Sequence, residues 1–96
     1  MPSYRVTVAV GALRAGVRPE LVLPAAADAA AELTVVEASS VDVVAREARL
    51  TVRFMADTVD EAVTIAQHTV DRVDTLAQTG DWRVTERVGG RWFRRT

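Results

Sequence analysis

The chain has 96 residues, of which 49% are apolar and 26% are charged, and its formal net charge is −1. This balance is typical of one folded domain spanning residues 1–96, and it excludes a disordered chain. Because the chain has no cysteine, a disulfide framework, a thiolate metal site and a cysteine nucleophile are also excluded. No apolar run reaches the ~18–20 residues that cross a bilayer, and no signal peptide is visible. We therefore expect a cytoplasmic protein that is not bound to a membrane.

The twelve basic residues are all arginine, and alanine and valine are abundant, which is typical of a GC-rich bacterial genome. The charge is unevenly distributed along the chain. Residues 58–81 hold one arginine against five acids, whereas residues 82–96 hold five arginines against one glutamate. An acidic segment followed by a basic one predicts charge complementarity, either within one chain or between two copies.

The first third of the chain predicts a strand followed by a helix. Residues Tyr4–Leu13 alternate with a period of two, which indicates a half-buried strand whose even positions face the core. The start of the helix is open. Either Pro19 is its first residue and Pro24 kinks it, or Pro24 is the first residue and Pro19–Leu23 is only a turn. In both cases Ala25–Leu33 is helical.

Two further strand-like runs follow at Val41–Ala45 and Arg49–Ala56. The apolar phase slips ahead of the first run, so we interpret Ala38–Ser40 as a bulge or loop. A tight turn near Glu47–Ala48 would set the register between the two strands. It pairs Val43 with Val52 and Ala45 with Leu50 on the core face, and Asp42 with Arg53 on the other face.

Residues Thr58–Gln78 predict a long amphipathic helix. Thr58 and Glu61 have the spacing of a capping box, in which each side chain satisfies the other residue's backbone amide. Gly80 is expected to end the helix. One stripe of the helix is apolar and should face the sheet, whereas His68 lies opposite that stripe and should be exposed.

A last strand is predicted at Trp82–Val88, and Gly89–Gly90 has the spacing of a hairpin turn into a possible short fifth strand at Arg91–Arg95. The order β-α-β-β-α-β predicts an α+β ferredoxin-like sandwich. We expect an antiparallel sheet in the order 4-1-3-2 with both helices on one face. The expected core consists of Val6, Val8, Val10, Val43, Val52, Phe54, Val63, Ala66, Val70, Val73 and Val84.

No arrangement of residues predicts catalytic, cofactor-binding or metal-binding chemistry. His68 has no second histidine or cysteine as a co-ligand, and the acids of its helix lack the spacing of an EF-hand loop. No serine lies in a strained elbow, and the glycines form no phosphate-binding loop. We therefore expect no cofactor and do not predict an enzyme.

The sheet face that the helices leave open gives the leading functional hypothesis. The predicted interface on this face consists of Thr7, Ala9, Val44, Thr51, Arg53, Met55 and Trp92. Its mixture of small, apolar and charged residues favours a non-enzymatic accessory domain that forms a homodimer, sheet against sheet.

Two alternatives stay open. One is a ligand-binding protein or cofactor-independent enzyme of the dimeric α+β-barrel type, with a cavity between sheet and helices. The other is RNA binding through the open face and the arginines at positions 91, 94 and 95. Because Tyr4 and Phe54 have the parity of the core, only Trp92 or Phe93 could stack on bases. No motif identifies a family.

Overall fold

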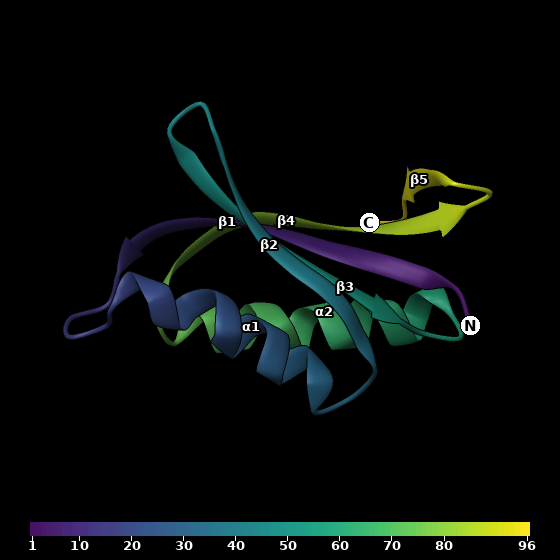
Figure 1. Cartoon of the computed structure of the whole chain (residues 1–96), viewed down its shortest axis with the longest axis horizontal. Coiled ribbons are helices and arrows are strands. Elements are labelled where there is room, and N and C mark those ends of the chain that lie inside the picture. Colours follow the sequence, from purple (N-terminus) through teal and green to yellow (C-terminus); the bar gives the residue numbers. More distant parts are fainter.

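The computed structural model describes residues 1–96 as two helices and a five-stranded sheet (Figure 1). In chain order the elements are β1 (Ser3–Leu13), the 3-10 turn η1 (Pro19–Leu21), α1 (Val22–Ala31), β2 (Val36–Val44), β3 (Glu47–Met55), α2 (Val59–Asp74), β4 (Ala77–Val88) and β5 (Arg91–Arg94). Both helices lie on the same face of the sheet (Figure 1). The chain is therefore a two-layer α+β protein.

The sheet is antiparallel throughout, with the strand order β2-β3-β1-β4-β5. This order differs from the expected four-stranded 4-1-3-2 because β5 extends the sheet beyond β4; the other strands, counted from β4, run 4, 1, 3, 2. The fifth strand forms because Gly89 and Gly90 adopt positive φ angles of 57° and 87°, which close a two-residue hairpin. The arrangement is compatible with a ferredoxin-like fold.

The β2–β3 hairpin turns earlier than the sequence pattern indicates. Its turn lies at Ala45 and Arg46, with φ angles of 51° and 66°, so the predicted turn at Glu47–Ala48 was wrong. A two-residue turn with positive φ at both positions is usually marked by asparagine or glycine. Ala45 and Arg46 are not residue types that indicate such a turn, so the sequence pattern does not locate it.

The register of β2 against β3 is shifted accordingly. Val43 pairs with Ala48 and not Val52, Leu50 pairs with Val41 and not Ala45, and Asp42 pairs with Arg49 and not Arg53. The shift is even, so each side chain keeps the face that was expected. The depth of burial changes, however. Val43, an expected core residue, is 72% exposed because the hairpin rises away from the helices (Figure 1).

β2 is also longer than predicted, because it begins at Val36. Ala38–Ser40, interpreted from the sequence as a bulge or loop, pair with β3 as strand residues. The irregularity lies one step earlier, between Val36 and Ala38, and leaves Glu37 as the extra residue. A bulge of this kind reverses the alternation of side chains, which explains the slip in apolar phase.

The two prolines near α1 occupy separate turns, so the structure combines parts of both sequence alternatives. Pro19 opens η1, and Pro24 is the third residue of α1. The first N–H groups of a helix have no acceptor within the helix, so Pro24 removes no hydrogen bond there. α1 ends at Ala31, two residues before the expected end at Leu33.

Thr58 caps α2, as the sequence predicts. Its Oγ1 accepts a hydrogen bond from the Glu61 N–H at 3.1 Å. The reciprocal bond differs from a regular capping box, because the Glu61 carboxylate accepts from the N–H of Asp57, at 3.4 Å, instead of from Thr58.

α2 ends at Asp74 instead of Gln78, and the chain enters β4 at Ala77, five residues before the predicted strand. Gly80 therefore lies in β4 and does not end the helix. A Cβ at Gly80 would come within 3.2 Å of the Ala9 Cβ, so glycine permits close approach of β4 to β1. Neither helix combines the length and apolar composition needed to cross a membrane.

The core lies between helices and sheet and is centred on Tyr4 and Phe54. These residues are 1% and 0% exposed, and their rings stack with centroids 6.2 Å apart. Burial raises the pKa of the Tyr4 phenol. The expected core residues that are buried are Val6, Val8, Val52, Phe54, Ala66, Val70, Val73 and Val84. Val10 and Val63 are only half-buried.

Candidate anion site on the open sheet face

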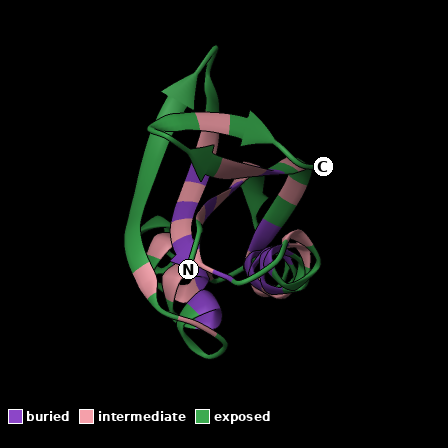
Figure 2. Cartoon of the chain, turned by 90° about the vertical axis from the view of Figure 1, so that its right-hand side faces the viewer, coloured by how far each residue is buried: buried purple, intermediate pink, exposed green.

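The sheet face away from the helices is hollowed and rich in arginine. We call it the concave face. It consists of Arg5, Thr7 and Ala9 of β1, Asp42 and Val44 of β2, Arg49, Thr51 and Arg53 of β3, Arg83 and Thr85 of β4, and Trp92 of β5. In Figure 2 the sheet curls, with the exposed β2 along one side and the β4–β5 hairpin crossing above the face. A curled sheet presents a hollow instead of a flat surface.

Arg5 and Arg53 lie at the centre of the concave face. They are Cα partners in the β1–β3 ladder, so their side chains project side by side from the same face. Arg49 and Arg83 line a hollow that also includes Arg5. We call Arg5, Arg49, Arg53 and Arg83 the arginine cradle. Like charges placed directly opposite destabilise a sheet, so a negatively charged group bound at the cradle would be stabilising.

Trp92 covers part of the arginine cradle. The guanidinium carbon of Arg5 lies 3.8 Å from the Trp92 ring centroid, and that of Arg53 lies 5.3 Å from it. The negative face of an indole ring attracts cations, so Trp92 offsets part of the repulsion. The Gly89–Gly90 turn makes this contact possible because it folds β5 back beside β4.

Carboxylates compensate the cradle only in part. Arg49 pairs with Glu47 at 3.4 Å, and the Arg53 Nε lies 3.4 Å from a Glu37 carboxylate oxygen. That Nε is nevertheless buried and makes no hydrogen bond of proper geometry. A buried donor without an acceptor is costly, and because this Nε is buried its acceptor has to come from the protein, where the Glu37 carboxylate lies beside it.

Two adjoining hollows lie among the cradle arginines. The smaller, of about 260 Å³, is lined by Arg5 and Arg53 with Ala38, Ser39, Ser40, Asp42 and Thr51. The larger, of about 370 Å³, adds Arg49, Arg83 and Trp92 to Arg5, Asp42 and Thr51. These volumes are near the lower end of the ~300–1,000 Å³ range of small-molecule sites. Guanidinium and hydroxyl donors outnumber the one carboxylate, Asp42, which favours an anion.

The predicted interface residues do not all lie together. Thr7 and Thr51 are Cα partners with hydroxyl oxygens 3.2 Å apart, and Ala9, Arg53 and Trp92 share their face. Val44 and Met55 lie at opposite ends of the hairpin strands. The predicted interface omits the other three arginines of the cradle. Alternation with a period of two already points Arg5 and Arg83 at the open face, and the odd position of Arg49 in the same pattern is the signal that could have added it.

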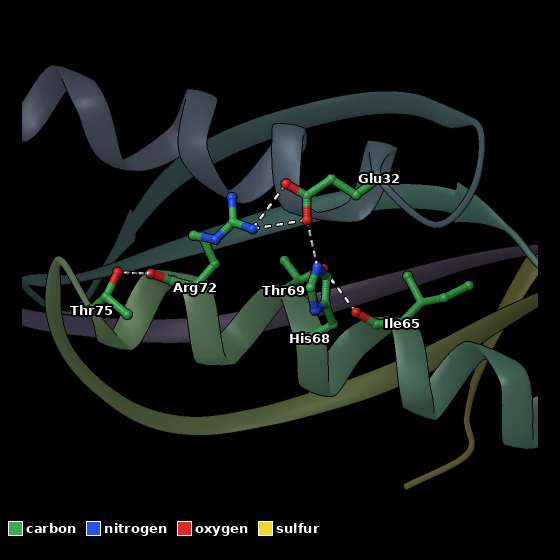
Figure 3. A network of polar contacts seen from close by, with 6 residues as sticks. All are labelled: Glu32, Ile65, His68, Thr69, Arg72 and Thr75. Atoms are coloured by element: carbon green, nitrogen blue, oxygen red, sulfur yellow. Dashed lines mark hydrogen bonds and ion pairs between the residues drawn. The ribbon is translucent and has the colours of Figure 1, made fainter.

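A second polar cluster joins the two helices (Figure 3). The Glu32 carboxylate, just after α1, accepts two hydrogen bonds from Arg72 at 2.8 and 2.9 Å and lies 2.8 Å from His68 Nε2. The hydrogen bonds from Arg72 and then from His68 lower the pKa of Glu32. His68, predicted to be a solvated side chain, therefore holds α2 to the end of α1. The three side chains line none of the hollows of the structure.

An apolar groove lies on the helix side of the sheet. It has a volume of about 560 Å³ and lies between the start of α1, the last residues of β1 and the first residues of β3. Its apolar lining includes Val10, Leu13, Val22, Leu23, Val41 and Leu50. The groove is open to solvent, unlike the internal cavity that a dimeric α+β-barrel type of ligand protein would need.

No group of three or more histidine, cysteine, aspartate or glutamate side chains lies close enough to hold a metal ion. No protein-family model, curated protein or solved structure matches the chain. The function must therefore be inferred from the chemistry of the concave face.

Proposed function

We propose that this chain is a small non-enzymatic binding domain whose concave face holds a small anion carrying phosphate or carboxylate groups. The observation that carries the proposal is the direct opposition of Arg5 and Arg53, together with the lack of an ion pair at Arg5 and Arg83, whereas Arg49 and Arg53 have Glu47 and Glu37. Guanidinium groups bind phosphate and carboxylate through paired, charge-assisted hydrogen bonds. A ligand phosphate or carboxylate would supply the negative charge that Arg5 and Arg83 lack.

The charge of the whole concave face supports the same proposal. Its three hollows are lined by Arg5, Arg49, Arg53, Arg83 and Arg94 against Asp42 and Asp81. Glu37 and Glu47 offset part of this charge through their ion pairs with Arg53 and Arg49, but the arginines still outnumber the carboxylates. A hollow lined by one sign of charge attracts the opposite ion.

The same charge weakens the expectation that two copies pack through their concave faces. Such a dimer would bring two arginine cradles together and remove both from water, which is expensive without paired carboxylates. The apolar centre expected there is also small, because Thr7 and Thr51 already contact each other through their hydroxyl groups.

RNA fits the concave face less well than a small anion does. Single-stranded RNA is held largely by aromatic side chains that stack on bases. Trp92 is the aromatic residue on this face, and Arg5 already lies 3.8 Å from its ring centroid. Tyr4 and Phe54 are buried in the core. Of the arginines expected to contact RNA, Arg95 is held by Glu86 at 3.0 Å.

Calorimetric titration with pyrophosphate and with citrate, at low ionic strength, tests the proposal and separates phosphate from carboxylate ligands. We expect one of them to bind, and Arg5→Gln or Arg53→Gln to weaken binding by about tenfold or more, since a charged hydrogen bond contributes about 1.5–3 kcal/mol. Arg18→Gln is the matched control, because Arg18 is 73% exposed and pairs with Glu20, away from the concave face. Its affinity should equal that of the wild type.

Two results would overturn the proposal. One is that neither pyrophosphate nor citrate binds; if a single-stranded RNA oligonucleotide then binds with a steep salt dependence, the function would move to RNA binding. The other is that Arg5→Gln, Arg53→Gln and Arg18→Gln weaken binding equally.

A further inference from the structure

We propose that two copies of this chain pair through their β2 strands, in antiparallel order, so that the two sheets become one. This inference goes beyond the proposed anion site and does not depend on it. The occupant of the β2 edge is a second copy of the chain, and the interface differs from the concave face.

β2 is an edge strand with an unprotected outer side. Eight of its nine residues are exposed, and it pairs on one side only, with β3. Natural edge strands are usually shielded by charged side chains, proline, β-bulges or short length. The bulge of β2 lies near its first end, at Glu37, and Asp42 is the only charged residue in the rest of the strand. The second half of β2 instead exposes three valines by 46% (Val41), 72% (Val43) and 45% (Val44). In Figure 2 it is exposed along almost its whole length.

The valines of β2 adjoin the apolar groove on the helix side of the sheet. Val41 itself lines this groove, together with Leu50, its Cα partner on β3. Val43 has the same parity as Val41, so it projects from the same side of the sheet. Two copies joined at β2 would bring their Val41 and Val43 side chains together beside both grooves. Each copy would then cover part of the apolar surface that Val41 and Val43 expose on the other copy.

Symmetry limits the ways in which β2 can pair with itself. Two antiparallel strands in one continuous sheet are related by a two-fold axis perpendicular to it, which places both helix layers on the same side. Directly opposite residues must then project from the same face. The two-fold axis therefore passes beside one residue, which lies opposite its own copy, and each choice of that residue defines one register.

Charge and strand length select one register among these. An axis through Asp42 would oppose two aspartates, which destabilises a sheet. An axis through Val41 opposes Val41 to the partner's Val41, and Asp42 to the partner's Ser40. It also opposes Val43 to the partner's Ser39. An axis through Val43 would pair only residues 42–44, because β2 ends at Val44, whereas the axis through Val41 pairs residues 38–44 without opposing carboxylates. Both concave faces stay open.

Engineered cysteines test this register directly, because the chain has no cysteine of its own. Opposite residues of an antiparallel pair have Cα atoms about 4.5–5.5 Å apart, which suits a disulfide. Val41→Cys should therefore form a disulfide-linked dimer on mild oxidation. Val43→Cys should not, because its two copies would lie about 13 Å apart along the strands. A mixture of Val43→Cys and Ser39→Cys should cross-link.

Sedimentation at micromolar concentration tests the association itself. We expect the wild type to have the mass of a dimer and Val41→Glu that of a folded monomer, because the substitution opposes two carboxylates at the axis. Val35→Glu is the matched control, since Val35 is 63% exposed but lies outside β2. It should stay dimeric. Circular dichroism shows whether Val41→Glu remains folded. If it unfolds, the cross-linking of the cysteine variants decides whether the β2 strands pair.

A wild-type protein of monomer mass would overturn the proposal, as would a Val41→Cys protein that does not cross-link. Ala9→Arg separates the β2 edge from the concave face, because Ala9 projects from the latter. A dimer that is split by Ala9→Arg and survives Val41→Glu would place the interface on the concave face instead.

Discussion

Arg5 of β1 and Arg53 of β3 lie directly opposite each other, and both guanidinium groups lie near the ring of Trp92. Two like charges in this position should destabilise the β1–β3 pair. The ring and the Glu37 carboxylate, 3.4 Å from Arg53 Nε, are the groups that counteract this repulsion. The centre of the concave face is therefore held together by a residue from the last strand of the chain.

We expect Trp92 and Arg5 to be energetically coupled. In a double-mutant cycle with Trp92→Ala and Arg5→Met, the coupling energy should be about 0.5–1 kcal/mol in favour of the native pair, the usual strength of a cation–π contact near a surface. Urea unfolding of the four proteins measures it. The single change Arg5→Met carries less information, because it removes the contact with the ring and also the repulsion by Arg53.

The matched cycle replaces Arg18 instead of Arg5. Arg18 precedes η1, on the helix side of the molecule, and makes no contact with Trp92. Its coupling to Trp92→Ala should be zero within error. Equal coupling in the two cycles would mean that Trp92 stabilises the fold without regard to charge.

The sequence predicts the element order, and it predicts the faces of the strands better than their ends. Alternation with a period of two assigns Tyr4 and Phe54 to the core correctly, because burial on one face is what the pattern records. Val43 has the same parity and is exposed, because the pattern contains nothing about how far the helices extend over the sheet. The turn at Ala45 and Arg46 depends on positive φ angles, and neither alanine nor arginine is a residue type from which positive φ would be predicted.

The candidate site was predicted only in part for a similar reason. Alternation places Arg5 and Arg53 on the open face. Their direct opposition depends on the β1–β3 register, which cannot be predicted from the sequence because the two strands are not joined by a short turn. The contact of Trp92 with both depends further on β5 folding back. His68 was assigned correctly to the side of α2 away from the apolar stripe, yet its partner Glu32 lies 36 residues away.

Phe54→Ala should severely destabilise the core. Phe54 is 0% exposed and stacks on Tyr4, so its truncation removes a large apolar side chain and leaves a cavity. We expect a loss of about 3–5 kcal/mol in the free energy of unfolding, which is a large share of the about 5–15 kcal/mol that stabilises a typical domain. Denaturant unfolding measures the loss.

Phe93→Ala is the matched control, because Phe93 is 42% exposed and the Arg95 guanidinium carbon lies 5.7 Å from its ring centroid. It should cost less than about 1 kcal/mol. Similar losses for the two phenylalanines would contradict the assignment of the core to the helix side of the sheet.

Glu32 should make stability depend on pH in the acidic range. Its pKa is lowered in the folded chain, first by the hydrogen bonds from Arg72 and then by His68. A carboxyl group with a lowered pKa binds protons more weakly in the folded state than in the unfolded state. Its contribution is therefore complete above the unfolded pKa, and is lost as the pH falls through the folded pKa. The stability difference between wild type and Glu32→Gln should shrink below about pH 4.

Glu20→Gln is the control for that comparison, because the Glu20 carboxylate is 67% exposed and its ion pair with Arg18 is longer, at 3.7 Å. Its stability relative to wild type should change little with pH. Titration of the Glu32 carboxyl carbon by NMR adds a direct test. Arg72→Gln should raise the pKa of Glu32 more than His68→Ala does, since Arg72 donates two hydrogen bonds, at 2.8 and 2.9 Å, and is the larger cause of the shift. The opposite ranking would mean that His68, and not Arg72, holds the carboxylate between the helices.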